Sequence, residues 1–529
     1  MSDWRSAVAP FPARFNLCAY YLDSNLDEGR GGKVALVAGQ ERRTFAEVAR
    51  RARLVAAALR RAGVRPEERV LIVLPDRFEF AESFFGVLRA GGVFAMVNPL
   101  LKQDDFAYTI EYSKARVAIV HAEAMGEFGP AARAARHLKH VFVVGGDAGG
   151  FTDYEQALAG ERDGASETEV EPTGPDDLAG WLFTSGSTGK PKACVHTHAD
   201  FAWSTETYAK EVVRYSEGER CLSVPKLFFG YATGTNLMFP FRFGGSAILF
   251  EGRSTADELF DQIAAHRPTL LTSVPTMINT MLRSPRMETA DLASLRVVLS
   301  AGEALPPQLY REWKAKTGVE ILDGIGSAEM FHIYISNRLD DVKEASLGKI
   351  VPGYEAAIVG EDGREVPVGE PGLLRVRGGS TALCYWADKE KSRKTFQGEW
   401  CTSADLFHRD ADGYYFYEGR ADDLLKVSGI FCSPLEIENA LLAHPAVAEA
   451  CVCGHDEGDG LTKPYAFLVL KDGHAGSDAL AAELKLWVKS RLAPHKYPRW
   501  YEWRAELPKN DRGKVARKEL KDELARRRT

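Results

Sequence analysis

Residues 181–192 read Trp-Leu-Phe-Thr-Ser-Gly-Ser-Thr-Gly-Lys-Pro-Lys, a short apolar run followed by small, hydroxylated and basic residues. The apolar run predicts the end of a strand, and the residues after it predict a loop. Glycines let backbone N–H groups approach an anion closely, and the lysines add positive charge. The loop differs from the usual P-loop, because Pro191 follows Lys190 where Ser or Thr would open a helix. The stretch predicts a polyphosphate site, with a flexible surface loop as the alternative.

Strands and helices alternate on both sides of this loop. Thr44 and Glu47 predict a capping box that opens a helix running to Gly63. Continuous apolar strands between amphipathic helices indicate parallel sheets covered by helices on both faces. Residues 145–178 are polar and rich in Gly and Pro, and predict a loop region. The predicted strands are 70–74, 93–97, 117–120, 141–144, 246–250, 269–272 and 296–300, and the predicted helices are 78–89, 256–266 and 306–317.

A chain of 529 residues exceeds what one compact core holds, so two or more domains are expected. Residues 345–420 combine short strands with Gly-rich turns, including 361–363, and predict a small β-subdomain. A separate α+β pattern begins at about 422. The expected fold is therefore α/β, with a large N-terminal domain over 1–421 and a small C-terminal domain over 422–529. Within the latter, the predicted helices are 435–442 and 480–492, the predicted strands are 450–453 and 465–470, and the basic tail 514–528 is predicted to be helical.

Composition excludes several classes of function. The net charge of −7 argues against a protein that binds nucleic acid or anionic membranes. No apolar run approaches the ~20 residues of a membrane span, and the first residues lack the apolar core of a signal peptide. The eight cysteines form no CxxC pair, and Cys451 and Cys453 would share one face of a strand. Reduced thiols in a cytoplasmic protein are expected.

Residues 184–192, followed by Val195-His196-Thr197-His198, resemble the phosphate-loop signature of the adenylate-forming enzymes. That superfamily comprises acyl-CoA synthetases, peptide-synthetase adenylation domains and beetle luciferases. The resemblance implies that this loop holds the phosphates of ATP. The implied contacts are Thr184, Ser185, Gly186, Ser187, Thr188, Gly189 and Lys190.

A second motif, 323–329, reads Asp-Gly-Ile-Gly-Ser-Ala-Glu after an apolar stretch. Its glycines permit close approach of a flat ring or a phosphate, and Glu329 could hold Mg²⁺, which prefers one or two carboxylates plus phosphate oxygens. A tight turn with a surface acid is the alternative. The motif is similar to the family's nucleotide and magnesium motif, but Ala328 replaces the usual Thr, which removes one hydrogen bond to the α-phosphate. The resemblance implies nucleotide contacts at Asp323, Gly324, Ile325, Gly326 and Ser327, and at Gly302 and Glu303 in the adenine-side loop.

Three further motifs match the family in order. Ser403-Ala-Asp-Leu resembles its ribose-binding segment, and a carboxylate such as Asp405 can accept from both ribose hydroxyls. The resemblance implies that Arg420 contacts ribose, that Asp422 is the hinge, and that Lys514 is the catalytic lysine. Residues after the hinge would line the entry of CoA, namely Lys426, Ser428 and Gly429.

These parts imply a two-step chemistry. A carboxylate becomes an acyl donor when it is joined to the α-phosphate of ATP, and AMP then leaves when a thiol attacks. Two unit charges ~4 Å apart repel by roughly 4 kcal/mol at an effective dielectric of ~20, so the first step needs positive charge. Lys514 and Mg²⁺ on Glu329 would supply it. The same lysine would block the thiol, so rotation about Asp422 is expected between the steps.

The acid pocket most resembles that of benzoate-CoA ligases, on residues 225–231 and 323–333. The resemblance implies an aryl site, and glycine at 230, where those enzymes usually carry Ala, leaves room for a 2-amino, 2-hydroxy or fluoro substituent. Core packing is the alternative for Phe228 and Phe229. The expected aryl-site residues are Gly230, Tyr231, Ala301, Gly326, His332 and Ile333.

The expected activity is therefore that of an ATP-dependent aryl-CoA ligase that uses ATP, Mg²⁺ and CoA. Nucleic-acid and membrane partners are not expected. A stand-alone adenylation protein that loads a carrier protein is one alternative. A weakly catalytic nucleotide-binding relative is another, motivated by Ala328.

Overall fold

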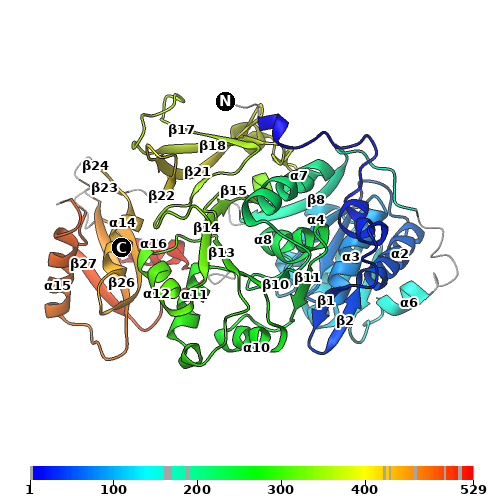
Figure 1. Ribbon diagram of the computed structural model, residues 1–529, viewed down its shortest axis with the longest axis horizontal. Coiled ribbons are helices and arrows are strands. Elements are labelled where there is room, and N and C mark those ends of the chain that lie inside the picture. Colours follow the sequence, from blue (N-terminus) through cyan, green and yellow to red (C-terminus); the bar gives the residue numbers. More distant parts are fainter. Residues whose placement is uncertain are drawn as a thin grey trace.

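The structure is a computed structural model. It describes residues 4–159, 169–185, 190–420, 425–427, 430–456, 462–493, 496–509 and 515–527, with backbone alone at positions 185, 420, 426, 430 and 431. Within these residues, two large sheets lie beside a small antiparallel sheet, and a separate C-terminal part carries the last strands and helices (Figure 1). The expected α/β architecture is confirmed.

One large sheet carries the phosphate loop. Its eight strands run in the order β19-β9-β8-β4-β3-β5-β6-β7, and β8, β4, β3, β5, β6 and β7 are mutually parallel. The loop joins β8 to the antiparallel β9. The strand bounds are β3 (Arg69–Val73), β4 (Val93–Met96), β5 (Val117–His121), β6 (His140–Val144), β7 (Thr152–Asp153), β8 (Leu178–Ser185), β9 (Pro191–Thr197) and β19 (Cys384–Tyr385).

The other large sheet shares a hydrophobic core with the first. Its nine strands run in the order β16-β15-β14-β13-β12-β10-β11-β1-β2, parallel from β1 to β14 through β11, β10, β12 and β13. The strand bounds are β1 (Val34–Ala38), β2 (Glu41–Thr44), β10 (Arg220–Ser223), β11 (Ser246–Leu249), β12 (Leu270–Ser273), β13 (Val297–Ala301), β14 (Glu320–Gly326), β15 (Ile333–Ser336) and β16 (Lys349–Ile350).

Helices cover both faces of each sheet, as the apolar strands predict. Val70 and Ile72 of β3 enter the core between the two sheets, whereas Leu71 and Val73 enter a second core under α4 and α5. The far face of the nine-stranded sheet packs against α10, α11 and α12. The helix bounds are α1 (Ser24–Asp27), α2 (Phe45–Arg61), α3 (Phe78–Arg89), α4 (Gln103–Ser113), α5 (Met125–Ala134), α6 (Tyr154–Ala159), α7 (His198–Ser204), α8 (Gly230–Thr233), α9 (Phe239–Arg242), α10 (Ala256–His266), α11 (Pro275–Arg283) and α12 (Pro307–Thr317).

Short 3-10 and π-helical segments complete this part of the chain. The 3-10 segments are η1 (Trp4–Ala7), η3 (Ala122–Ala124), η6 (Pro285–Glu288) and η7 (Ala328–Met330), and the π-helical segments are η2 (Ala19–Asp23), η4 (Thr205–Val213) and η5 (Gly234–Met238).

The capping box at the start of α2 is confirmed, because the Thr44 side chain accepts from the Glu47 N–H and the Thr44 N–H donates to the Glu47 carboxylate. The prediction of a loop region over 145–178 is wrong in part, since β7 and α6 lie within it. Tyr154 and Leu158 of α6 are buried, and this one-sided burial holds a short helix in an otherwise polar stretch.

The predicted β-subdomain is a five-stranded antiparallel sheet. Gly363 has a positive φ of 76°, which suits the predicted turn at 361–363. The bounds are β17 (Tyr354–Val359), β18 (Gly372–Gly378), β20 (Phe396–Gln397), β21 (Trp400–Arg409), β22 (Tyr415–Arg420) and α13 (Lys389–Thr395).

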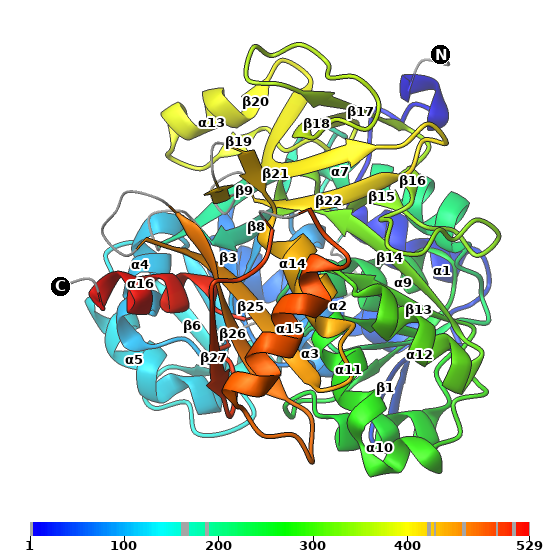
Figure 2. The same cartoon turned by 90° about the vertical axis from the view of Figure 1, so that its left-hand side faces the viewer.

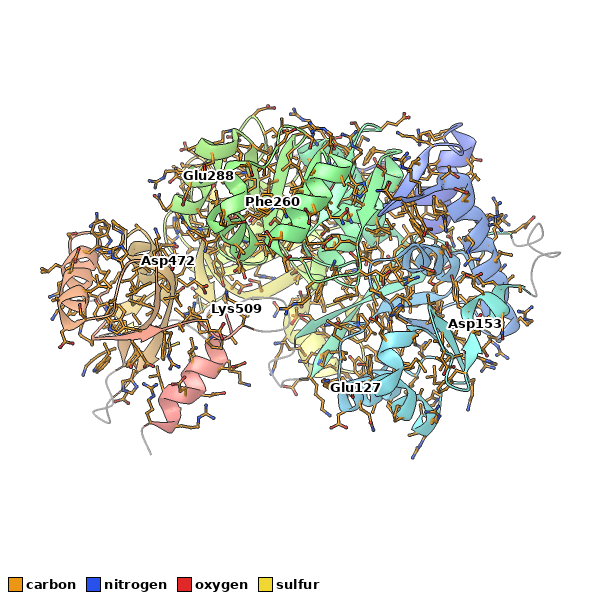
Figure 3. All side chains as sticks on the ribbon, turned by 90° about the horizontal axis from the view of Figure 1, so that it is seen from below. Glu127, Asp153, Phe260, Glu288, Asp472 and Lys509 are labelled. Atoms are coloured by element: carbon orange, nitrogen blue, oxygen red, sulfur yellow. The ribbon has the colours of Figure 1, made fainter. Side chains whose placement is uncertain are left out.

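The C-terminal part has cores of its own. Helices α14 and α15 pack on one face of its three-stranded sheet and α16 on the other, where Cys451 and Cys453 lie together (Figure 2). Figure 3 shows Lys509 on the side of this part that faces the larger one. The bounds are β23 (Leu425–Val427), β24 (Ile430–Cys432), α14 (Pro434–Leu442), β25 (Val447–His455), β26 (Lys463–Leu470), α15 (Asp478–Lys489), β27 (Trp500–Arg504) and α16 (Arg517–Arg526).

All eight cysteines are free thiols, as expected. Among the described residues, none of the helices has the length and apolar character needed to cross a bilayer.

Candidate active site

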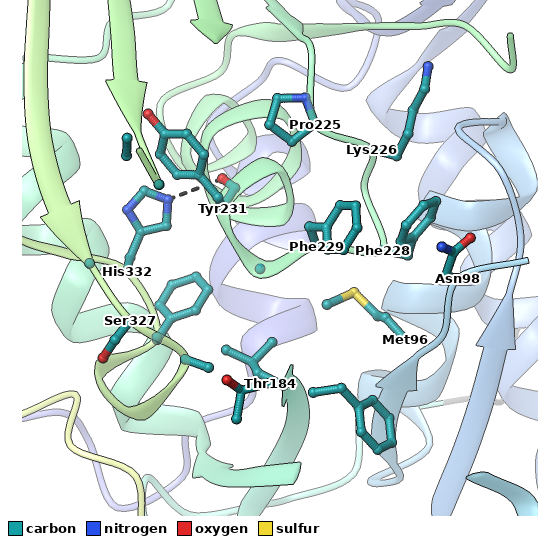
Figure 4. A pocket seen from close by; sticks show the side chains of 18 of the residues that line it. Met96, Asn98, Thr184, Pro225, Lys226, Phe228, Phe229, Tyr231, Ser327 and His332 are labelled. Atoms are coloured by element: carbon teal, nitrogen blue, oxygen red, sulfur yellow. Dashed lines mark hydrogen bonds between the residues drawn. The ribbon is translucent and has the colours of Figure 1, made fainter. Parts of the chain in front are cut away.

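A cavity of about 890 Å³ lies between the end of β8, the loop before α8, and the ends of β13 and β14. Figure 4 shows Tyr231 and His332 on one side, Phe228, Phe229 and Met96 on another, and Thr184 below them. All six residues predicted for the aryl site line this one cavity: Gly230, Tyr231, Ala301, Gly326, His332 and Ile333. They come from α8 and from the ends of β13, β14 and β15, so the fold brings together residues that are far apart in the sequence.

His332 is a neutral, fixed part of the wall. Its Nε2 atom lies 3.1 Å from the Tyr231 carbonyl oxygen, which only accepts, so Nε2 carries the proton (Figure 4). Burial lowers the pKa of His332 to about 3, and its ring lies 5.4 Å from that of Tyr231. An uncharged, mostly aromatic wall suits a flat apolar ring.

Two glycines set the size of this pocket. A Cβ atom at Gly326 would stand 2.6 Å from the His332 carbonyl oxygen, so no side chain fits there without a backbone shift. A Cβ atom at Gly230 would stand 3.3 Å from Cδ1 of Leu182, a tight contact that a small movement could relieve. Position 230 can therefore tune the pocket, whereas position 326 cannot.

The loop before α8 is held by a buried carboxylate that the sequence analysis did not single out. Asp76, which is 2 % exposed, accepts a 2.8 Å hydrogen bond from the Leu227 N–H, and burial raises its pKa to about 6. Lys226 donates to the Phe250 carbonyl at 2.7 Å, and burial lowers the pKa of Lys226 to about 8. An acid three residues after a buried strand and a lysine among apolar residues were the available signals in the sequence.

The predicted nucleotide residues whose side chains are described lie in more than one place. Thr184, Gly302, Gly326, Ser327, Glu329 and Asp405 line the same cavity as the aryl site. Gly324, Ile325 and Glu303 instead line a neighbouring cleft, and Glu303 accepts from the N–H and the hydroxyl of Thr276 at 2.9 and 2.8 Å. Lys190 is exposed, with its Nζ atom 4.8 Å from the Tyr108 ring centroid.

Asp323 lies in neither lining. It is 6 % exposed within β14, and burial raises its pKa to about 8. The structure thus places it beneath the nucleotide residues of its motif rather than among them.

Glu329 fits a magnesium ligand of the substrate-bridging kind. It lines the cavity, and its Oε1 atom accepts a 2.6 Å hydrogen bond from the Tyr385 hydroxyl. Among the described residues there is no group of three or more His, Cys, Asp or Glu that could hold a metal ion. A single carboxylate matches the preference of Mg²⁺ for few protein ligands plus phosphate oxygens.

Asp405 and Arg420 are paired directly across β21 and β22, so their motifs meet in space. The side chains of Ser185, Arg420 and Lys426 are not described. Eight predicted site residues lie outside the described residues: Gly186, Ser187, Thr188, Gly189, Asp422, Ser428, Gly429 and Lys514.

A second cavity of about 900 Å³ lies between the C-terminal part and the larger part. Lys471, Lys509 and Arg517 line it from the C-terminal side. Thr184, Gly302, Gly326 and Asp405 line both cavities, so the two meet at the predicted adenylation point.

Comparison with known proteins identifies the family of the chain. The AMP-binding enzyme family matches residues 24–386, and the AMP-binding enzyme C-terminal domain matches residues 436–514. A benzoate–CoA ligase of Thauera aromatica is 42 % identical over 512 residues, covering 96 % of each chain.

Two solved structures are similar over nearly the whole chain. An anthranilate CoA ligase in complex with anthranoyl-AMP superposes with a TM-score of 0.92 at 38 % identity, covering 97 % of this chain and 98 % of that one. A benzoate CoA ligase of Burkholderia xenovorans LB400 superposes with a TM-score of 0.88 at 41 % identity, covering 96 % and 99 %. The chain therefore belongs to the AMP-binding enzymes and, within them, to the aryl-CoA ligases.

Proposed function

We propose that this aryl-CoA ligase activates benzoate or a small ring-substituted benzoate, such as 2-aminobenzoate, and transfers the aroyl group to CoA. One observation carries the proposal: the six aryl-site residues and the nucleotide residues Thr184, Glu329 and Asp405 line a single cavity. The acid and the α-phosphate would therefore meet without either leaving the site. The relatives named for benzoate and anthranilate support the substrate class.

In the first step, an oxygen of the aryl carboxylate attacks the α-phosphorus of ATP and pyrophosphate leaves. Glu329 is the carboxylate that would hold Mg²⁺, whose charge offsets that of the phosphates. The loop 184–190 is proposed to hold the β- and γ-phosphates, and Asp405 and Arg420 the ribose. Lys514 is proposed to bring the cation to the two reacting anions.

In the second step, the sulfur of CoA attacks the carbonyl carbon of the adenylate, the thiol proton passes to solvent, and AMP leaves. We propose that the domain 422–529 turns about Asp422 to withdraw Lys514 and to bring the segment with Lys426, Ser428 and Gly429 to the site. The cavity between the C-terminal part and the larger part supports this, because it reaches the residues at which the first cavity ends.

A pyrophosphate-release panel tests the function. Benzoate, 2-aminobenzoate, 2- and 4-hydroxybenzoate, cinnamate and cyclohexanecarboxylate are supplied with Mg·ATP, with and without CoA. We expect pyrophosphate with benzoate or 2-aminobenzoate, and aroyl-CoA with AMP once CoA is present. Release of pyrophosphate without thioester formation would favour a protein that loads a carrier protein. No release of pyrophosphate with any of the acids would favour a nucleotide-binding relative.

A further inference from the structure

We infer that His196, which has no role in the site described above, is a positioning residue that sets Glu329 relative to the phosphate loop. The inference rests on the proposed function, because it assigns Glu329 to Mg·ATP. His196 lies near the end of β9, the strand that leaves the phosphate loop, and it is fully buried. Its partners come from two separate elements.

One ring nitrogen of His196 reaches the Glu329 motif. Nε2 lies 2.7 Å from the carbonyl oxygen of Ala328, the residue directly before Glu329. A carbonyl oxygen only accepts, so Nε2 is the donor. This is a direct link between the strand after the phosphate loop and the turn that carries the predicted magnesium ligand.

The other ring nitrogen fixes the orientation of the ring. Nδ1 lies 2.9 Å from Oδ2 of Asp200, which also accepts from the Thr197 N–H at 3.1 Å. Oδ1 of Asp200 accepts from the Thr197 hydroxyl at 2.8 Å. Asp200 therefore caps α7 and accepts from Nδ1 with the same carboxylate, so both ring nitrogens donate and the two contacts together orient the ring toward Ala328.

The turn that His196 holds needs external support. Phe331, directly after η7, has a φ of 61° and a ψ of −57°, a strained conformation for a bulky residue. Three successive carbonyls are each held from outside: Ala328 by His196, Glu329 by the Ala382 N–H at 2.8 Å, and Met330 by the Ser380 hydroxyl at 2.8 Å. Of these three donors, only His196 belongs to the phosphate-loop strand.

The side chain of Glu329 is also connected to β9, through Tyr385. Its Oε1 atom accepts from the Tyr385 hydroxyl, and Tyr385 of β19 is paired with Cys194 of β9. β9 therefore holds the backbone before Glu329 directly, through His196, and holds the Glu329 carboxylate indirectly, through Tyr385 of the neighbouring β19. Ala328 lacks the hydroxyl that the family pattern places at this position. The contact that His196 makes at residue 328 is therefore with the backbone carbonyl and not with a side chain.

Three variants test the inference by two readouts. His196→Leu removes both contacts, and His196→Gln keeps an N–H that can reach the Ala328 carbonyl. His198→Leu is the matched control, because His198 is buried two residues away but accepts from the Leu17 N–H instead. The first readout is the Kd for Mg²⁺ with a non-hydrolysable ATP analogue. The second is the ratio of the pyrophosphate-releasing rate to the thioester-forming rate from supplied benzoyl-adenylate.

We expect His196→Leu to weaken Mg-dependent nucleotide binding and to lower the pyrophosphate-releasing rate by about 10- to 100-fold. This is the usual range for a residue that orients a metal ligand. The thioester-forming rate should change little, and His196→Gln should restore most of the loss. His198→Leu should lower the melting temperature without changing the ratio of the two rates.

The inference is overturned if His196→Leu binds and reacts like wild type, if His198→Leu shows the same selective loss, or if Gln is no better than Leu. Should His196→Leu fail to fold, Asp200→Asn takes its place, since it weakens the hold on Nδ1, and an unchanged Kd would overturn the inference. A wild-type chain that releases no pyrophosphate with any acid defeats the proposed function, while the nucleotide Kd still decides the role of His196.

Discussion

The two walls of the cleft are built in different ways. On the side proposed to hold the phosphates, Glu329 and its turn are held by directed hydrogen bonds from distant elements, from the Tyr385 hydroxyl to Glu329 and from His196 to the Ala328 carbonyl. On the acid side, rings lie against one another, and Tyr231, Phe239 and Tyr208 surround the neutral His332. The first wall should be sensitive to the loss of a single charge or donor, and the second to changes in volume.

The largest loss should follow removal of the cation proposed for the phosphate side. Lys514→Ala should slow adenylate formation by ~10²–10³-fold, the scale of one lost transition-state contact. Thioester formation from supplied aryl-adenylate should be largely spared, because the proposed rotation withdraws the lysine before the thiol attacks. Rapid-quench measurement of both half-reactions separates them, and the exposed Lys518→Ala in α16 is the control. Equal losses in the two half-reactions would contradict the division of labour.

Glu329 and Tyr385 should rank next and differ from each other. Glu329→Gln keeps the shape but removes the charge, so the pyrophosphate-releasing rate should fall by ~10²-fold. Tyr385→Phe removes the hydroxyl that donates to Glu329 at 2.6 Å but leaves the carboxylate in place, which should lower the rate by about 10-fold.

A tyrosine–glutamate pair outside the cleft provides the control for Tyr385→Phe. Tyr310 donates to Glu320 at 2.5 Å on the far side of the nine-stranded sheet, so Tyr310→Phe should leave the rate unchanged. If Tyr385→Phe matched Glu329→Gln, the hydroxyl rather than the carboxylate would be the group that matters.

The acid side should respond to volume instead. A Cβ atom at position 230 presses on Leu182 at 3.3 and 3.4 Å, so Gly230→Ala should narrow the pocket. We expect kcat/KM for 2-aminobenzoate to fall by about 10-fold, the effect of one methyl group in an apolar pocket, while benzoate is nearly unaffected. Adding Leu182→Val should restore the substituted acid, and a parallel loss for both acids would contradict a role in ring selection.

Local patterns in the sequence fix the helices more closely than they fix the cleft. The predicted bounds of α3 and α10 match the structure, and the Thr44–Glu47 cap is formed, because each depends on residues a few positions apart. The same alternation of strands and helices along the sequence is compatible with one large sheet or with two. The order of the strands within the sheets could therefore not be predicted. The contact of His196 with Ala328 joins residues 132 positions apart, and no local pattern reports it.

The smallest effect should come from Asp323, whose carboxyl group lies buried behind the cleft. Burial raises its pKa from 3.8 to about 8, so the folded chain holds a proton there that the unfolded chain has released. Between these values the folded state binds more protons than the unfolded state, and stability therefore falls as the pH rises. Asp323→Asn keeps the shape and never ionises, so its gain in melting temperature should be a few degrees at pH 8 and smaller at pH 5. The exposed Asp104→Asn in α4 should show no such difference between the two pH values. A variant whose melting temperature shifts equally at both would mean that Asp323 is ionised in the fold, and that the acid side, too, depends on a charge.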